Sequence, residues 1–166
     1  MVSMDTLFTP WRYSYIIATG QDEDCFFCAA TIDLDDPERL VVHVADHHIV
    51  MLNRHPYSNG HLMVAPRRHV PQPHDCDVAA QAEFWPLVLR TQQVIEQVCH
   101  PHGMNLGLNL GRAAGAGVPG HFHFHLVPRW TADTNFMSVL GDVRLVPEDL
   151  MAQWRKFRSA FAAEDE

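Results

Sequence analysis

The chain has 166 residues, of which 47% are hydrophobic and 19% are charged, so composition argues against global disorder and fits one domain with a sizeable core. The formal net charge of -8 disfavours a broad nucleic-acid-binding surface, although a local anion pocket made of main-chain amides and histidines remains compatible with it. The apolar runs are far shorter than a membrane span, and residues 1–16 lack the apolar centre of a signal peptide. We therefore expect a cytoplasmic protein with no membrane or nucleic-acid partner.

The predicted elements, taken in chain order, describe a single α+β domain that includes residues 1–166. Residues 1–24 are predicted to form an irregular N-terminal arm, residues 25–128 the core, and residues 129–166 a C-terminal extension. Short alternating or apolar stretches predict strands, and apolar residues at steps of three and four predict helices. The predicted strands are 41–44, 47–53, 61–65, 104–110 and 121–128, and the predicted helices are 77–99 and 147–161.

The ends of the two helices have their own signals. Asp75 or Asp77 is a suitable cap for the first helix, and Pro147 suits the first turn of the second. Pro86 falls inside the first helix, so we expect that helix to be kinked or split there.

Histidines alternate with apolar residues in the stretch HFHFHLVP, at residues 121–128. On a strand this alternation puts His121, His123 and His125 on one face and the apolar residues on the other. One such histidine is most often an ordinary surface residue, but three are costly to bury without partners and therefore indicate a polar site. The loop before them, GRAAGAGVPG, has Gly115 and Gly117 free to turn main-chain N–H groups toward an anion. Together the loop and the strand predict a phosphate site with a nucleophile beside it.

These motifs resemble the histidine-triad (HIT) superfamily. The stretch from Asn109 to His125 carries the family's alternation, and MLNRHPYSNGHLMVAPRRHV looks like its nucleoside-binding strand, loop and following strand. NFMSVLGDVRLVP, with PHGMNLGLNLG and VPRW, is similar to the bacterial branch that includes diadenosine-tetraphosphate phosphorylases. The resemblance implies a HIT-like antiparallel sheet of about five strands, with one long helix and a C-terminal helix. It also implies a homodimer in which the sheet is extended across both subunits.

The resemblance implies a role for each catalytic residue. His123 takes the position of the nucleophile, which attacks an α-phosphorus and forms a nucleotidyl-histidine intermediate. His125 would contact phosphate oxygens or help to protonate the leaving group. His121 and His61 take the positions of supporting histidines, and the carbonyl of His121 or of a neighbour would orient the nucleophile.

The resemblance also implies the substrate contacts. Asn53 matches a ribose-binding position, although it could simply close a turn, and Asn109 matches a contact on the phosphate side. Ala116-Gly117-Val118 stands where many members carry Gln and Ser, so phosphate contacts would rely more on the main chain. The full predicted substrate-binding set is Asn53, Asn109, Gly115, Ala116, Gly117, His123 and His125.

Cys25 and Cys28 form a C-x-x-C pair, a spacing that lets both thiolates reach one metal ion. Within the resemblance, His69 and His121 take the positions of two further ligands, which implies a structural Cys2His2 zinc site. The pair could instead be a redox couple or two free thiols. Rival histidine ligands are His43, His47 and His48, while Cys76 and Cys99 are interpreted as ordinary thiols.

The resemblance implies an enzyme that acts on a nucleotide conjugate without an organic cofactor. Water as the second acceptor would make it a hydrolase, phosphate a phosphorylase, and a sugar phosphate a transferase. The branch similarity favours phosphorolysis of diadenosine tetraphosphate to ADP and ATP. The alternatives are hydrolysis of nucleoside polyphosphates or phosphoramidates to a nucleoside monophosphate, and a nucleotide-binding or zinc module without turnover. Trp130 could stack on a base, including one from a partner subunit, or pack in the core.

Overall fold

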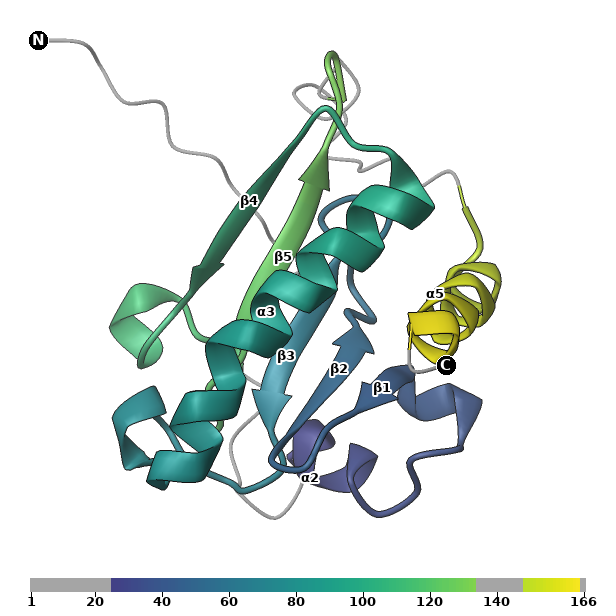
Figure 1. Cartoon of the computed structure of the whole chain (residues 1–166). Coiled ribbons are helices and arrows are strands. Elements are labelled where there is room, and N and C mark those ends of the chain that lie inside the picture. Colours follow the sequence, from purple (N-terminus) through teal and green to yellow (C-terminus); the bar gives the residue numbers. More distant parts are fainter. Residues whose placement is uncertain (1–24, 134–147, 165–166) are drawn as a thin grey trace, which may run out of the picture.

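The computed structural model describes residues 25–133 and 148–164, which contain one antiparallel sheet and three α-helices (Figure 1). The strands are β1 (Val41–Val44), β2 (His48–Leu52), β3 (Leu62–Pro66), β4 (Gly103–Leu108) and β5 (Phe124–Arg129), in the spatial order β1-β2-β3-β5-β4. The helices are α2 (Phe26–Ala30), α3 (Val78–Cys99) and α5 (Leu150–Glu164), with 3-10 turns at Pro37–Arg39, Pro73–Asp75 and Arg112–Ala114. The prediction of an α+β fold with a five-stranded antiparallel sheet is confirmed. Within the described ranges, every helix is too short or too polar to cross a membrane.

Each predicted strand and helix is present, with ends that differ by up to three residues. The largest difference in the sheet is the last strand, which begins at Phe124 and not at residue 121. Just before it, the N–H of Phe122 donates to the carbonyl of Val70 at 2.9 Å, outside the sheet ladder. The sheet ladder therefore does not extend back to His121. The predicted facing still holds, because the rings of His121 and His123 both lie beside Phe27 on the α2 side, whereas the rings of Phe122 and Phe124 both lie beside Phe84 on α3.

The predicted arm 1–24 lies outside the described residues, as does Pro147. The predicted helix start at residue 147 is wrong, because α5 begins at Leu150 and the Asp149 side chain accepts hydrogen bonds from the first-turn N–H groups of Met151 and Ala152.

The long helix α3 runs without interruption through Pro86, so of the two predicted effects, a kink or a split, the split is wrong and the kink stays a prediction. Pro86 lies on the exposed side of the helix, and the apolar side chains that follow it, among them Val88 and Ile95, are fully buried against the sheet. This packing holds the helix together despite one missing main-chain hydrogen bond. Asp77 is the cap, because its carboxylate accepts a hydrogen bond from the N–H of Ala80 at 2.9 Å.

The two faces of the sheet have different roles. One face supplies Val50, Leu52, Leu62, Val64 and Leu126 to the main core, to which α3 and α5 also contribute. In Figure 1, α3 crosses in front of this face and α5 lies beside β1. The other face supplies Val41, Ile49, Met51, Met63 and Ala65, which pack against α2. Since α2 has only five residues, it leaves room for a pocket on that second face.

The strand register places one row of residues across the second face. Met51 on β2 pairs with Met63 on β3, Met63 pairs with His125 on β5, and His125 pairs with Gly107 on β4. Neighbouring strands are spaced by about 4.8 Å, so Met51 lies roughly 10 Å from His125 across the sheet. The row therefore has an apolar end at the methionines and a polar end at His125.

In the described residues, one edge strand of the sheet is covered by a helix and the other is open. At one edge, the indole Nε1–H of Trp154 on α5 donates to the carbonyl of Val41 on β1 at 2.8 Å. At the other edge, β4 has a partner on one side only, and Leu106 is 40% exposed. Figure 1 shows β4 as the outermost strand, away from α5.

Candidate active site and metal centre

A pocket of about 350 Å³ opens on the second face of the sheet, next to α2. This volume is in the range of sites for small molecules. Methionines from β2 and β3, together with Phe26 and Leu40, form one side, and two histidines form the other. The lining residues are Phe26, Glu38, Arg39, Leu40, Met51, Asn53, Arg54, His55, Tyr57, Met63, Asn109, Gly115, Gly117, His123 and His125.

His123 lines this pocket with one ring nitrogen fixed and the other available. Its Nδ1 lies 3.0 Å from the carbonyl oxygen of His121, and because a carbonyl only accepts, Nδ1 must carry the proton. The Nε2 atom of the neutral ring is then unprotonated, which is the form that a nucleophile needs. Burial lowers the pKa of His123 from its usual value, which favours this neutral form. The carbonyl of His121 therefore orients the ring of His123, as expected from the sequence.

A chain of hydrogen bonds also fixes the proton positions of His61 and His125. The main-chain N–H of Tyr57 donates to Nδ1 of His61 at 3.1 Å, so His61 carries its proton on Nε2. That Nε2 lies 2.9 Å from Nδ1 of His125, which must accept, so neutral His125 carries its proton on Nε2. The Tyr57 ring lies beside both imidazoles, with centroid distances of 4.6 Å to His61 and 5.9 Å to His125.

The two predicted asparagines both line the pocket. The side-chain Oδ1 of Asn53 accepts from the N–H of His55 at 2.9 Å, so this residue closes a turn and lines the pocket as well. Its amide NH2 is the group left to contact a ribose oxygen. Asn109 follows β4 and lies on the same lining as His125 and the glycines.

The glycine-rich loop differs from the expected bed of main-chain amides. Gly115 and Gly117 line the pocket, but Ala116 is 5% exposed and is not part of the lining. The N–H groups of Gly115 and Ala116 donate within the loop, to the carbonyls of Arg112 and Gly111. These two N–H groups therefore already donate hydrogen bonds within the turn. Of the three predicted contacts, Gly115, Ala116 and Gly117, only the N–H of Gly117 takes no part in these two turn bonds.

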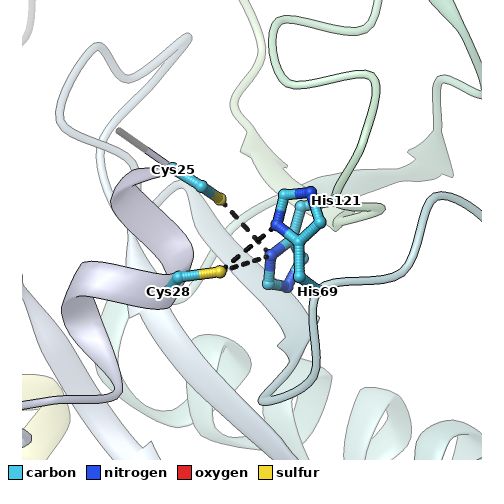
Figure 2. A group of neighbouring side chains, drawn as sticks. All are labelled: Cys25, Cys28, His69 and His121. Atoms are coloured by element: carbon cyan, nitrogen blue, oxygen red, sulfur yellow. Dashed lines mark hydrogen bonds between the residues drawn. The ribbon is translucent and has the colours of Figure 1, made fainter. Parts of the chain in front are cut away.

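Figure 2 shows Cys25, Cys28, His69 and His121 pointing toward one another, on α2, on the loop after β3 and just before β5. Their four ligand atoms all lie within 4.8 Å of one another. Nδ1 of His121 is 3.4 Å from Sγ of Cys25 and 3.6 Å from Sγ of Cys28, and Nδ1 of His69 is 3.2 Å from Sγ of Cys28. Neighbouring ligands of a tetrahedral zinc ion with ordinary bond lengths are about 3.4–3.8 Å apart, so the set fits a zinc ion.

The electrostatics of this cluster also suit a metal ion. Burial lowers the pKa of His121 to about 4, so its ring is neutral, as a ligand must be. Burial and the neighbouring Cys25 raise the pKa of Cys28 to about 11, so a thiolate there needs a cation to stabilise it. The rival histidines lie elsewhere: Nδ1 of His48 is 2.8 Å from Glu83, and the His43 ring stacks on Phe161.

His121 connects the cluster of Cys25, Cys28, His69 and His121 to His123. Its Nε2–H donates to the carbonyl of Pro66 at 2.8 Å, which leaves Nδ1 to face the cysteines. Its own carbonyl holds His123. The ring of Phe27, between the two cysteines in sequence, lies 5.0 Å from the His121 ring and 4.8 Å from the His123 ring. His121 itself is fully buried and lies outside the pocket lining, so it does not share the pocket with the other two histidines.

Sequence reasoning missed several residues of the site. Tyr57 stands in the quoted stretch RHPYSNG, but a role carried by its main-chain N–H leaves no signal in the sequence. Phe26 and Phe27 were missed because a helix of five residues shows no periodicity. Trp130, at the end of β5, is half-buried.

Comparison with known proteins agrees with this geometry. The family model described as the HIT domain matches residues 36–132. The chain is 36% identical over 152 residues to the AP-4-A phosphorylase of Mycobacterium tuberculosis, a match that covers 87% of this chain and 78% of that protein. It is 38% identical over 82 residues to the asymmetrical bis(5'-nucleosyl)-tetraphosphatase of Schizosaccharomyces pombe, covering 49% of this chain and 44% of that protein.

Among solved structures, a Zn-bound histidine triad family protein from Mycobacterium smegmatis has a TM-score of 0.66 and 25% identity. That match covers 87% of this chain and 98% of the other. The family model covers more than half of the chain and includes each of the pocket histidines. The chain therefore belongs to the HIT domain family.

Proposed function

We propose that this HIT-family protein is an enzyme that cleaves diadenosine tetraphosphate by phosphorolysis and releases ADP and ATP. The observation that carries the proposal is His123, whose unprotonated Nε2 lines the pocket while its Nδ1 is held by the His121 carbonyl. The 36% identity to the AP-4-A phosphorylase of M. tuberculosis supports the substrate.

The substrate fits the pocket in one direction. The apolar end, with Met51 and Phe26, accepts the adenine, and Asn53 lies beside the ribose. The α-phosphate then lies at His123 and His125, with Gly117 and Asn109 around its oxygens. This direction follows from the row of paired residues that runs from the methionines to His125.

In the first step, Nε2 of His123 forms a bond to the α-phosphorus, and the bond to the bridging oxygen breaks with its electron pair leaving on ATP. In the second step, inorganic phosphate attacks the nucleotidyl-histidine, the P–N bond breaks, and ADP forms. Splitting one displacement into two lowers the barrier of each. Water in place of phosphate would give AMP, which is the hydrolase alternative that the S. pombe relative supports.

We also propose that Cys25, Cys28, His69 and His121 hold one structural zinc ion. Four protein ligands close the site and leave no position for a substrate, which is typical of structural zinc. When bound, the ion would supply a positive charge that stabilises the thiolates. The residues themselves connect α2 and the loop after β3 to the segment that carries His123.

The protein is further proposed to form a homodimer through β4. This strand has no partner strand on its outer side, so main-chain groups along that edge are open for pairing. Exposed apolar side chains are also present, at Leu106, Leu110, Trp85 and Leu89. An edge of this kind favours pairing with a second copy, which would extend the sheet across both subunits.

The function is tested by incubating the purified protein with diadenosine tetraphosphate, with and without inorganic phosphate. We expect ADP and ATP in equal amounts only when phosphate is present. His123→Asn should fold normally and still bind AMP, but should lose turnover by about 10⁴-fold or more because the nucleophile is missing. AMP formed at the same rate in phosphate-free buffer would exclude phosphorolysis, and an active His123→Asn variant would exclude covalent catalysis by this residue.

A further inference from the structure

One buried side chain connects α5 to the segment that leads into β3. Gln153 is 2% exposed, and its Oε1 accepts a hydrogen bond from the main-chain N–H of Gly60 at 2.7 Å. Its Nε2 donates to the carbonyl of Glu148 at 3.0 Å. Since a main-chain N–H only donates and a carbonyl only accepts, these two groups fix which end of the Gln153 amide faces Gly60.

The segment that Gln153 holds has one residue on each face of the sheet. Leu62, the first residue of β3, belongs to the main core together with Phe157 of α5. The residue before it is His61, whose ring lies 5.1 Å from the ring of His125 in the pocket. A helix of the core layer is therefore bonded to the residue that directly precedes a histidine of the site.

A shift of Gly60 would reach the pocket through His61. A buried main-chain N–H needs an acceptor, so loss of the Gln153 oxygen forces Gly60 to move toward another one. Nε2 of His61 lies 2.9 Å from Nδ1 of His125, and the His125 ring lies 4.9 Å from the ring of His123. Displacements of about 1 Å at a reacting group are enough to slow a reaction strongly.

Other contacts hold the adenosine end of the pocket. Leu40 and Met51 line it, and the N–H of Leu52 donates to the carbonyl of Leu40 at 3.0 Å. On this side α5 uses the neighbouring residue, because the indole of Trp154 donates to the carbonyl of Val41 at 2.8 Å. Two successive residues of one helix thus hold two different sides of the pocket.

We propose that Gln153 is a positioning residue for the reaction, which acts through the N–H of Gly60 to keep His61 against His125. The inference rests on the proposed function, because its effect is on the rate of that reaction. The HIT family model ends at residue 132, so the inference adds a residue of α5, outside the matched domain, to the machinery of the site.

Gln153→Met tests the proposal by replacing the amide with an apolar side chain of similar size. We expect kcat for diadenosine tetraphosphate to fall about tenfold or more, because a misplacement of about 1 Å can cost about 100-fold. KM should stay within about threefold of the wild-type value, since the contacts of the adenosine end are retained. A folded Gln153→Met protein with kcat within about threefold of the wild type would overturn the inference.

Two matched variants separate positioning from stability. Gln153→Glu keeps an oxygen for the N–H of Gly60 and loses the donor to Glu148, so the melting temperature should fall while kcat stays within about threefold. Trp154→Phe removes the other hydrogen bond of α5 and should likewise lower the melting temperature without lowering kcat. A loss of kcat in either variant as large as that in Gln153→Met contradicts the proposal. If Gln153→Met does not fold, the kcat of Gln153→Glu decides alone.

A spectroscopic measurement keeps this inference distinct from the proposed function. The imidazole signals of His61 and His125 in NMR spectra should shift in Gln153→Met and remain at their wild-type positions in Trp154→Phe. Unchanged signals in Gln153→Met would overturn the positioning role, whatever the substrate. A wild-type protein that does not cleave diadenosine tetraphosphate would remove the proposed function, while these signals would still decide whether Gln153 positions the two histidines.

Discussion

Gly60 shows how one residue without a side chain supports the pocket. Its φ is +69°, in the left-handed region, and its N–H donates to Oε1 of Gln153 on α5 at 2.7 Å. A Cβ added there would lie 2.7 Å from Sγ of Cys99 and 3.2 Å from the ring of Phe157. The residue that follows is His61, so Gly60 sets the path of the chain into the histidine pair.

Gly60→Ala should therefore lower the free energy of unfolding by about 2–4 kcal/mol, combining left-handed strain with overpacking. Chemical denaturation measures this loss. Gly111→Ala separates the two causes, because Gly111 also has a positive φ of 77° but a Cβ there meets nothing within 4 Å. Gly103→Ala has neither problem and should be nearly neutral. Equal effects of all three substitutions would contradict this account.

At the same scale, the sequence predicted side chains better than it predicted main-chain groups. The motif of alternating histidines was enough to point to His121, His123 and His125, because residue types determine side-chain chemistry, and the resemblance to the HIT superfamily then selected His123. The bond from Tyr57 N–H to His61 could not be predicted, since any residue except proline has an N–H and only the turn decides where it points. The same holds for the main-chain N–H groups of Gly115 and Ala116. They donate to carbonyls within their own loop, which the sequence could not predict.

Among the elements, β4 is the one from which we predict how two copies of the chain pair. It is an edge strand with a 40% exposed Leu106, whereas the opposite edge, β1, lies next to α5 and accepts a hydrogen bond from Trp154. Open edges with apolar side chains favour strand pairing between copies.

If the protein forms the proposed dimer through β4, Leu106→Lys should convert it to a monomer at micromolar concentration, because the substitution would bring two lysines near the paired edges. Sedimentation equilibrium measures the change, and the side chain is exposed enough for the monomer to remain folded. Ile32→Lys is the matched control, since Ile32 is 84% exposed and follows α2, far from β4 in sequence and in the sheet. A wild-type protein that sediments as a monomer would contradict the proposed interface.

Element types were predictable because the strands and the two long helices have clear apolar periods. The start of β5 was not, because the sequence alternates from residue 121 while the N–H of Phe122 bonds to Val70 instead of to a strand. The split at Pro86 was wrong because packing of α3 on the sheet outweighs the intrinsic effect of one proline. Local sequence contains neither of these tertiary effects.

For the whole molecule, the cluster of Cys25, Cys28, His69 and His121 is the feature that joins segments far apart in sequence. Removing the proposed zinc ion with a chelator should lower the melting temperature by about 10 °C, since a ligand at roughly 1,000 times its Kd adds about 4 kcal/mol. Calorimetry and metal analysis would measure it, with one zinc expected for each chain.

Cys28→Ser should reproduce the chelator's effect, because it removes one of four ligands. Cys76→Ser, at another buried cysteine that is not one of the four cluster residues, should retain the metal and serves as the control. Full zinc content in Cys28→Ser, or none in the wild type, would contradict the proposed site.

The separation of the ligands along the chain has a consequence for biosynthesis. Sγ of Cys25 and Nδ1 of His121 approach within 3.4 Å, yet the two residues are 96 positions apart in sequence. During translation, four of the five strands and all of α3 leave the ribosome before His121 does, and His123 follows two residues later. A nascent or truncated chain thus lacks both the complete Cys/His cluster and the proposed nucleophile, and it gains both nearly together.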